Sequence, residues 1–424
     1  MPRVRSIQDV VDYRLCMGCG ACVHVVGRDS GAMVDIPTVG LRPFFSRELS
    51  AEEEKRALSV CPGIRVTAPS EGGSHVAKEE SSRFDSPVAG RGYGAWEGYA
   101  SDSAVRAGGS SGGVITALCQ YCLDERDVDV VSHVGMAREE PWKNTNVLSE
   151  TRAELERGLG SRYAASSPCL SLSDIQRLEG KAVFVGKPCD AAAVALVLQQ
   201  QPQLRSRIAA VISFFCAGTP SSAAASELLE RNGADLSSLN AVTFRGEGWP
   251  GRFAAIDDRG DEVLSLSYSE SLAQLQRSRG LRCSLCADGM GEVADIACGD
   301  AWHRHTDDDN PGMSVVIART QRGRQIIEGA HRAGYLHLER VGVDSVVRSQ
   351  GSEAGLVKRR VDLWGRLLAL RLFGIPIPRY QGIRISDAWD RNSLWRKART
   401  VLGTMRRVVR KKLWKRMLLQ RPHR

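Results

Sequence analysis

The feature that most constrains this chain is a cysteine run near its N-terminus, Cys16-Met-Gly-Cys19-Gly-Ala-Cys22. Thiolates held two residues apart on a tight loop can converge on three irons of one cubane cluster. The intervening Gly18 and Gly20 let backbone N–H groups approach the cluster sulfides. Residues 1–70 are otherwise loop-rich, and we expect them to form a small ferredoxin-like domain.

The run is one ligand short of a complete set. Bacterial ferredoxins place a fourth cysteine, followed by proline, soon after the third, but no cysteine follows Cys22 at that distance. Cys61-Pro62 can supply the missing ligand, because Cys-Pro is the usual setting of the remote ligand. We therefore predict one [4Fe-4S] cluster on Cys16, Cys19, Cys22 and Cys61. A zinc site and a thiol cluster without iron remain the alternatives.

A second group of cysteines is dispersed along the chain. In a cytosolic protein thiols stay reduced, so grouped cysteines among the twelve indicate metal or redox chemistry rather than disulfides. The pair Cys283-Ser-Leu-Cys286 alone is equally typical of zinc sites and thiol redox pairs. Cys189 and Cys216 lie at the ends of predicted strands, and sheet topology can bring both to the same edge. We predict a second cluster on Cys189, Cys216, Cys283 and Cys286, with Cys298 as the alternative to Cys216.

Length and composition exclude several classes of protein. The chain has 424 residues, with 42% hydrophobic and 25% charged residues. This composition is that of a globular protein with two or three domains, not of a disordered or fibrous one. No apolar run approaches the ~18 residues that a transmembrane helix needs. No secretory signal is visible at the N-terminus, so we expect a cytoplasmic protein.

The centre of the chain alternates short β-branched runs with helical stretches. This alternation predicts an α/β core with a mainly parallel sheet over residues 93–345. Residues 71–92 are polar and rich in Gly, Ser and Pro, which indicates a linker. The predicted strands are 128–134, 181–185 and 209–215, with more in 243–257 and 314–319. The predicted helices are 114–123, 191–199 and 221–231, and Cys119 and Cys122 in the first of them are expected in the core.

The C-terminal extension, residues 346–424, ends in a basic segment. The net charge of the chain is +9, but residues 391–424 hold thirteen Lys or Arg and no acid, so the rest of the chain is slightly acidic. The charge therefore gives no reason to expect nucleic-acid binding by the core. The segment predicts an amphipathic helix that lies on the inner face of a membrane, docks on an acidic partner, or packs on its own body. Its predicted apolar stripe is Leu394, Ala398, Val401, Leu402, Met405, Val408 and Val409, with Arg396, Arg399, Arg406, Arg407 and Arg410 opposite.

A glycine-serine segment opens one predicted helix. Residues 107–114 read Ala-Gly-Gly-Ser-Ser-Gly-Gly-Val, and small residues at a helix N-terminus leave N–H donors free for an anion. The segment is neither a Walker loop nor a dinucleotide GxGxxG motif. A plain tight turn is the alternative.

Together these strings resemble the beta-subunit family of coenzyme F420 hydrogenases and dehydrogenases. The resemblance runs from the N-terminal cysteines to about residue 345 and rests on the order and spacing of many blocks. They are CMGCGAC, Cys61-Pro-Gly, GGSSGGVITALCQYCLDERDVDVV, FVGKPCDAAAV, FFCAGTPS, TFRGEGWPG and LRCSLCADGMGEVADIACGDAW.

The resemblance implies roles for particular residues. The family's serine-glycine helix start falls on Ser110, Ser111, Gly112 and Gly113, which we assign to FAD. Lys187 is expected to face the isoalloxazine ring, where a cation stabilises reduced anionic flavin. Arg245 is a candidate for the flavin phosphate or an acidic deazaflavin substrate, and Asp300 for orienting a ring or ribose.

The resemblance also implies a function. We expect an iron–sulfur flavoprotein oxidoreductase that passes electrons between [4Fe-4S] clusters, FAD and coenzyme F420 or a similar organic carrier. Ferredoxin or another redox protein is the expected electron partner. The alternatives are a ferredoxin-dependent reductase of another metabolite, for example in polysaccharide synthesis, and an electron-transfer subunit without catalysis. A zinc-stabilised scaffold is a weaker alternative.

Overall fold

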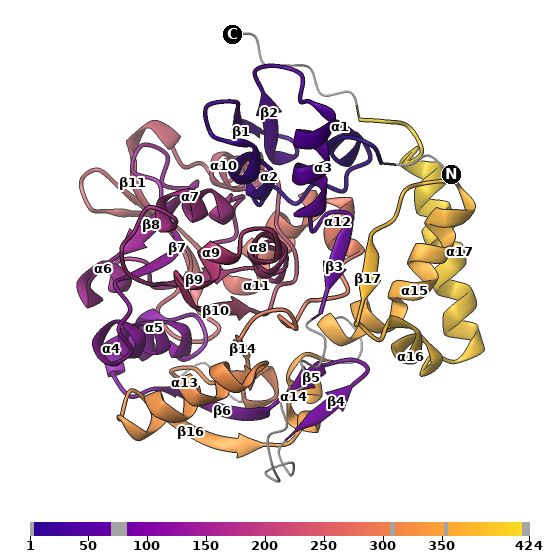
Figure 1. Cartoon of the computed structure of the whole chain (residues 1–424). Coiled ribbons are helices and arrows are strands. Elements are labelled where there is room, and N and C mark those ends of the chain that lie inside the picture. The colour runs from indigo at the N-terminus through magenta and orange to yellow at the C-terminus, as the bar shows by residue number, and fades with distance from the viewer. Residues whose placement is uncertain (1–3, 69–82, 306–309, 352–354, 418–424) are drawn as a thin grey trace.

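The fold is built on a mixed eight-stranded sheet (Figure 1). The computed structural model describes residues 4–68, 83–305, 310–351 and 355–417. The strands lie in the order β16 (Leu336–Val341), β6 (Gly94–Ala100), β15 (Ser314–Ala318), β14 (Ile296–Asp300), β10 (Ile208–Phe214), β9 (Ala182–Gly186), β7 (Val130–Met136) and β8 (Asn144–Ser149).

The sheet is not mainly parallel, and that prediction was wrong. Only the pairs β7–β9, β9–β10 and β10–β14 are parallel, while the other four of the seven pairings are antiparallel. Parallel neighbours need a crossover, usually a helix, whereas antiparallel neighbours can be joined by a short return. No α-helix lies between β14 and β15 in the part of that connection that is described, and β7 returns as β8 after a short loop.

The predicted strands and helices of the centre are present. The three strands appear as β7, β9 and β10, and the three helices as α5 (Val114–Glu125), α8 (Pro188–Gln200) and α10 (Ala223–Arg231). Residues 239–267 form a separate antiparallel sheet of β11 (Leu239–Gly246), β12 (Arg252–Asp257) and β13 (Glu262–Ser267). The shorter helices are α4 (Ser103–Gly108), α6 (Arg152–Glu156), α7 (Leu172–Ile175), α9 (Pro202–Arg205), α11 (Tyr268–Leu275) and α12 (Leu281–Ser284).

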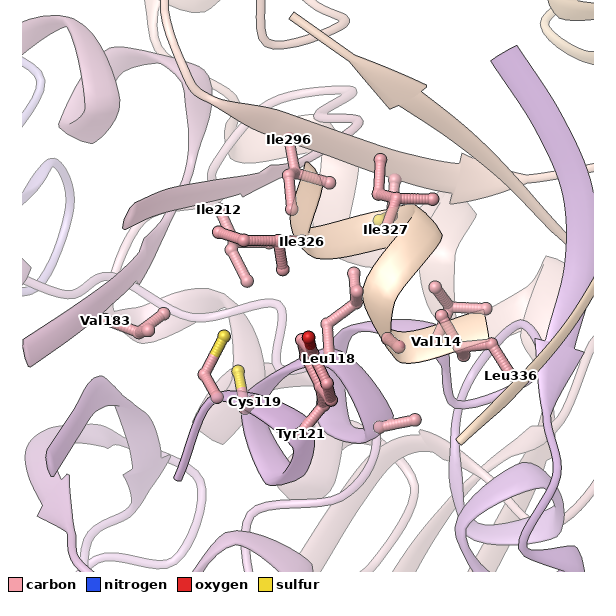
Figure 2. Close-up of a cluster of buried hydrophobic side chains, with 14 of the residues drawn as sticks. Val114, Leu118, Cys119, Tyr121, Val183, Ile212, Ile296, Ile326, Ile327 and Leu336 are labelled. Atoms are coloured by element: carbon pink, nitrogen blue, oxygen red, sulfur yellow. The ribbon is translucent and has the colours of Figure 1, made fainter. Parts of the chain in front are cut away.

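One core lies between the sheet and the helices α5 and α13 (Gln321–Arg332). Six consecutive residues of α5, 117–122, are buried, so the middle of the helix is covered on all sides. Cys119 and Cys122 lie in this core, as predicted. Figure 2 shows the side chains that meet there: Val114, Leu118, Cys119 and Tyr121 from α5, Ile326 and Ile327 from α13, and Val183, Ile212, Ile296 and Leu336 from the strands.

The N-terminal segment packs beside the sheet and meets the C-terminal part of the chain. Strand β3 (Arg65–Thr67) pairs in parallel with β17 (Arg379–Gln381), as Figure 1 shows. Serine capping boxes fix the starts of α1 (Ile7–Asp12) and α3 (Ala51–Ser59). The segment also contains α2 (Ala21–Val26), β1 (Gly31–Ile36) and β2 (Gly40–Phe45).

The C-terminal extension is mainly helical, with the short strand β17, and its basic end forms the predicted helix. The helices are α14 (Val343–Ser349), α15 (Leu356–Leu372), α16 (Ile385–Asp390) and α17 (Leu394–Arg410). The single apolar stripe predicted on α17 is wrong, because Val408 is buried whereas Leu394, Leu402 and Val409 are exposed. Packing against α15 divides the stripe into a covered part and an outer part.

Part of the predicted linker, residues 71–92, is ordered as a strand pair. β4 (Phe84–Ser86) pairs with β5 (Gly90–Gly92), while residues 71–82 lie outside the described residues. In the described part of the chain, no helix is both long enough and apolar enough to span a bilayer.

Candidate functional site

The four N-terminal cysteines surround one small cavity. Cys16, Cys19 and Cys22 come from the loop before α2 and its first turn, and Cys61 follows α3. The cavity has a volume of about 20 Å³, and its walls include Ile7, Val10, Met33 and Pro43. Burial, followed by the neighbouring Cys19 and Cys16 thiols, raises the pKa of Cys61 to about 12. Binding a metal here therefore releases protons.

Glycines make this loop possible. Gly18 and Gly20 have φ of 74° and 87°, in the region that other residues rarely adopt. A Cβ on Gly18 would lie 2.8 Å from the Leu41 carbonyl oxygen. A Cβ on Gly63 would lie 3.2 Å from the Cys61 sulfur, so the chain leaves room at that thiol.

The second group of four cysteines is also brought together. Cys189 lies in the first turn of α8, Cys216 follows β10, and Cys283 and Cys286 lie in and just after α12. Burial and the nearby Cys283 thiol raise the pKa of Cys216 to about 12, with Cys286 adding to the shift. The pKa of Cys189 is raised well above its usual value by burial and by Asp190, and Cys216 and Cys286 raise it further.

Cys298 lies in β14, next to β10, and lines the same cavity as Cys216. It belongs to the apolar core that contains Cys119 and Cys122. Burial alone raises the pKa of Cys298. Burial, Cys122 and Cys298 together raise the pKa of Cys119. The structure thus places Cys216, and not Cys298, beside the Cys283–Cys286 pair.

A larger cavity of about 260 Å³ lies at the carboxyl ends of β9, β10 and β14. This edge is where ligands bind in open α/β sheets. Most of the residues that the sequence assigned to a flavin meet here: Ser110, Ser111, Gly113, Lys187, Arg245 and Asp300 line the cavity, and Cys216 lines it as well. Gly112 is next to the lining residues and has φ of 101°, which suits a glycine.

Lys187 is held by a buried carboxylate. Its Nζ lies 2.7 Å from Oδ2 of Asp190, and it donates to Oγ of Ser166 at 3.1 Å. Burial lowers the pKa of Lys187, but the Asp190 carboxylate, followed by Cys189, outweighs burial and raises the pKa overall. Lys187 and Asp190 therefore form a buried ion pair, and both residues line the cavity.

Arg245 and Asp300 are paired with each other. Nη1 of Arg245 lies 3.1 Å from Oδ2 of Asp300, and Nη2 contacts the other carboxylate oxygen. Asp300 also accepts a hydrogen bond from Nε1 of Trp249 at 2.9 Å, and Nε of Arg245 donates to the Pro250 carbonyl at 2.6 Å. Both side chains thus form one wall of the cavity. Nε, Nη1 and Nη2 of Arg245 already donate hydrogen bonds to Pro250 and Asp300.

The residues present fit the cofactors that the sequence implies. Gly113 caps α5 without a side chain, so the first-turn N–H groups of a twelve-residue helix have no side-chain cap beside the cavity. Among the described residues, no three His, Cys, Asp or Glu side chains form a site for a single metal ion. The four N-terminal cysteines around one cavity are a donor set that an iron–sulfur cubane takes.

A buried arginine supports a cluster at the second group. Arg282 precedes Cys283, and Tyr380, followed by Cys286, Cys189 and Cys283, raises its pKa against the effect of burial. Its Nη1 atom is buried without a hydrogen-bond partner among the described residues. A cluster sulfur would accept a hydrogen bond from this N–H group, because cluster sulfurs are hydrogen-bond acceptors.

The three sites are contiguous. Cys16 and Cys283 line one cavity of about 140 Å³, and Arg282 donates to the carbonyls of Pro62 and Gly63 at 2.7 and 3.0 Å. A second link is the segment around the short helix η2 (Pro168–Ser171). Its Ser166 contacts Lys187 in the large cavity, whereas Oγ of Ser167 donates to the Gly18 carbonyl at 2.6 Å.

Sequence reasoning missed three of these residues. Asp190 had a local signal, since it stands at the third position of α8, where a carboxylate caps a helix start. Arg282 and Ser166 had none, because their partners are far away in the chain.

Two family models match this chain. The model for the N-terminal part of the coenzyme F420 hydrogenase/dehydrogenase beta subunit matches residues 95–173, and the model for its C terminus matches residues 180–343. Together they cover more than half of the chain. The chain belongs to this oxidoreductase family. The resemblance found in the sequence is thereby confirmed.

Individual relatives are distant. The F420-dependent formate dehydrogenase subunit beta of Methanocaldococcus jannaschii is 25% identical over 61% of this chain, and the match spans 65% of the relative, less than two thirds of its length. The coenzyme F420 hydrogenase subunit beta of Methanothermobacter thermautotrophicus is 24% identical over 55% of this chain and 79% of the relative.

A solved structure shares the fold. A chain of the F420-reducing [NiFe] hydrogenase complex from Methanosarcina barkeri superimposes with a TM-score of 0.55 at 20% identity, covering 70% of this chain and 98% of that one.

Proposed function

We propose that this chain is an iron–sulfur flavoprotein oxidoreductase that passes electrons between two [4Fe-4S] clusters, FAD and coenzyme F420 or a similar organic carrier. The contiguity of the three sites carries the proposal: Cys16 and Cys283 share one cavity, and Cys216 lines the next. Bound clusters would supply one-electron chemistry and a bound flavin would couple it to a two-electron carrier.

The chain's own residues would hold and orient these groups. Cys16, Cys19, Cys22 and Cys61 would hold one cluster, and Cys189, Cys216, Cys283 and Cys286 the other. The first turn of α5, with Ser110, Ser111, Gly112 and Gly113, would receive the flavin phosphates. Lys187 would favour negative charge that develops in the cavity, because Asp190 fixes its ammonium group there. The Arg245–Asp300 pair would shape the wall against which a ring or ribose lies.

Coenzyme F420 is the favoured carrier because the relatives described above are named for it. Both are also named as subunits, which supports a redox protein, ferredoxin or another subunit, as the electron partner.

The experiment is cofactor analysis followed by turnover. Anaerobically purified protein should contain about eight irons, matching acid-labile sulfide and one flavin per chain. Cys19→Ser and Cys283→Ser should each lose about half of the iron, and so should Cys216→Ser, whereas Cys298→Ser should retain it. Zinc without flavin would overturn the proposal.

Turnover separates the remaining alternatives. With an artificial one-electron donor, the loaded protein should reduce F420 by itself. Full cofactor content without F420 turnover would indicate either an electron-transfer subunit or a reductase of another metabolite.

A further inference from the structure

The outer side of the C-terminal helices gathers exposed apolar side chains. Ten large hydrophobic side chains are exposed among the described residues, and seven of them lie between Trp364 and Trp414. Single exposed apolar residues are normal, but a concentration of them marks an interaction surface. On α17 they are Leu394, Trp395, Leu402 and Val409, with exposed fractions of 84%, 76%, 55% and 52%.

These residues share one face of α17. At 3.6 residues per turn, the positions of Leu394, Leu402, Val409 and Trp395 fall within an arc of about 100°. The neighbouring arc contains Val408, which is buried in the core that α15 contributes to. α17 therefore has two apolar faces, of which the chain itself covers one. We call the other, made by Leu394, Trp395, Ala398, Leu402, Met405 and Val409, the outer face.

Positive charge borders the outer face. Arg399, Arg406 and Arg410 are exposed next to it and form no ion pair with any described residue. Arg396, Lys397 and Arg416 do have acidic partners, so only part of the basic character is neutralised within the molecule.

A cationic cavity lies beside these arginines. It has a volume of about 370 Å³, and none of its lining residues is acidic. Burial lowers the pKa of the Arg279 guanidinium, and the like charges of Arg359 and Arg407 lower it further. Six cationic residues line the cavity: Arg14, Arg277, Arg279, Arg407, Arg410 and Lys411.

We propose that the outer face of α17 lies in the interfacial layer of an anionic membrane. Leu394, Leu402 and Val409 would reach the acyl boundary, while the bordering arginines meet lipid phosphates. Two observations favour lipid over a protein partner. Trp395, in the first turn of α17, and Trp414, four residues beyond its end, are both exposed, and tryptophan is enriched at membrane–water interfaces. Residues 391–424 contain no acid, so their charge is of one sign and matches the uniformly negative surface of anionic lipid.

The test is co-sedimentation of the full-length protein with vesicles. We expect binding to vesicles of equal phosphatidylcholine and phosphatidylglycerol, little binding to phosphatidylcholine alone, and weaker binding as salt increases. The double variant Trp395→Gln, Leu402→Gln should bind at least about tenfold more weakly. Val263→Gln is the matched control, because Val263 is exposed on β13, outside the C-terminal helices, and should bind like the unchanged protein.

Several results would overturn the proposal. One is absence of binding to the anionic vesicles, and another is equal binding by the double variant. A third is a dimer in solution, measured by light scattering, that the double variant converts to a monomer, because a second copy would then cover the outer face. Unfolding temperatures of both variants check that the substitutions act at the surface. Vesicle binding is measured independently of cofactor content and F420 turnover, so its outcome does not depend on the proposed function.

Discussion

At the scale of single residues, Arg282 joins two parts of the molecule that are more than 200 residues apart in the chain. Arg282 is 2% exposed. Its guanidinium donates hydrogen bonds to the backbone just after Cys61 and lies near cysteines of the second group. A buried arginine of this kind stabilises through its hydrogen bonds and compensates thiolate charge.

Replacing Arg282 tests that role. Arg282→Met leaves two backbone carbonyls without their donor, at about 1–3 kcal/mol each, so the free energy of unfolding should fall by several kcal/mol. Arg277→Met, at an exposed position five residues earlier in the chain, is the control and should change the free energy of unfolding little. Urea unfolding of the three proteins measures the difference, and equal stability of both variants would contradict the role.

Gly113 is a second residue with a testable requirement. Its φ is 72°, and a Cβ there would lie 2.4 Å from the Val105 carbonyl oxygen. Gly233 has a similar φ of 83° but open space around it. Gly233→Ala should therefore lower the free energy of unfolding only by the backbone strain of a left-handed alanine, about 1–2 kcal/mol. Gly113→Ala should lower the free energy of unfolding by more than this, because a clash with the Val105 carbonyl is added to the strain. It should also lower the flavin content of the purified protein. Equal losses of stability for the two variants in urea unfolding would disprove the clash.

At the scale of elements, α17 shows how one helix serves two environments. Val408 and Val409 are neighbours in sequence, yet they are 0% and 52% exposed. The difference arises because successive residues of a helix point about 100° apart, and only one side of α17 meets α15.

Substitution of Val408 tests the packing of α17, and the same substitution of the exposed Val409 is the control. Val408→Ala should lower the free energy of unfolding by about 2 kcal/mol, because it leaves a cavity in the core under α17. Val409→Ala should change it by less than about 0.5 kcal/mol, since the side chain is already in solvent. Equal effects in denaturant titrations would show that α17 does not pack as described.

At the scale of the whole molecule, the two ends of the chain close around the N-terminal cysteine site. β3 pairs with β17, and Arg416 lies 3.1 Å from Oδ1 of Asp9 in α1. The two cysteine groups share one cavity through Cys16 and Cys283, and Arg282 connects them through the Pro62 and Gly63 carbonyls. In the proposed function, this shared cavity would place the two bound clusters next to each other.

Proximity of the two cysteine groups predicts a magnetic signature. When the reconstituted protein is fully reduced, its two clusters should interact, and the electron paramagnetic resonance spectrum should be broadened or split. Cys283→Ser should leave the simpler signal of a single N-terminal cluster, because the second site loses a ligand. A reduced spectrum that is the plain sum of two isolated signals would contradict the shared cavity.

The sequence by itself determined the local features of this protein. The spacing of Cys16, Cys19 and Cys22, the apolar run of α5 and the basic composition of residues 391–424 are local patterns, and local patterns reflect backbone and burial preferences directly. Only the tertiary structure decided the rest. The direction of β15 depends on the connection that precedes it, the choice between Cys216 and Cys298 as neighbour of Cys283 depends on strand order, and the exposure of Val409 depends on α15. These outcomes follow from contacts between residues far apart in the chain, which no local pattern encodes.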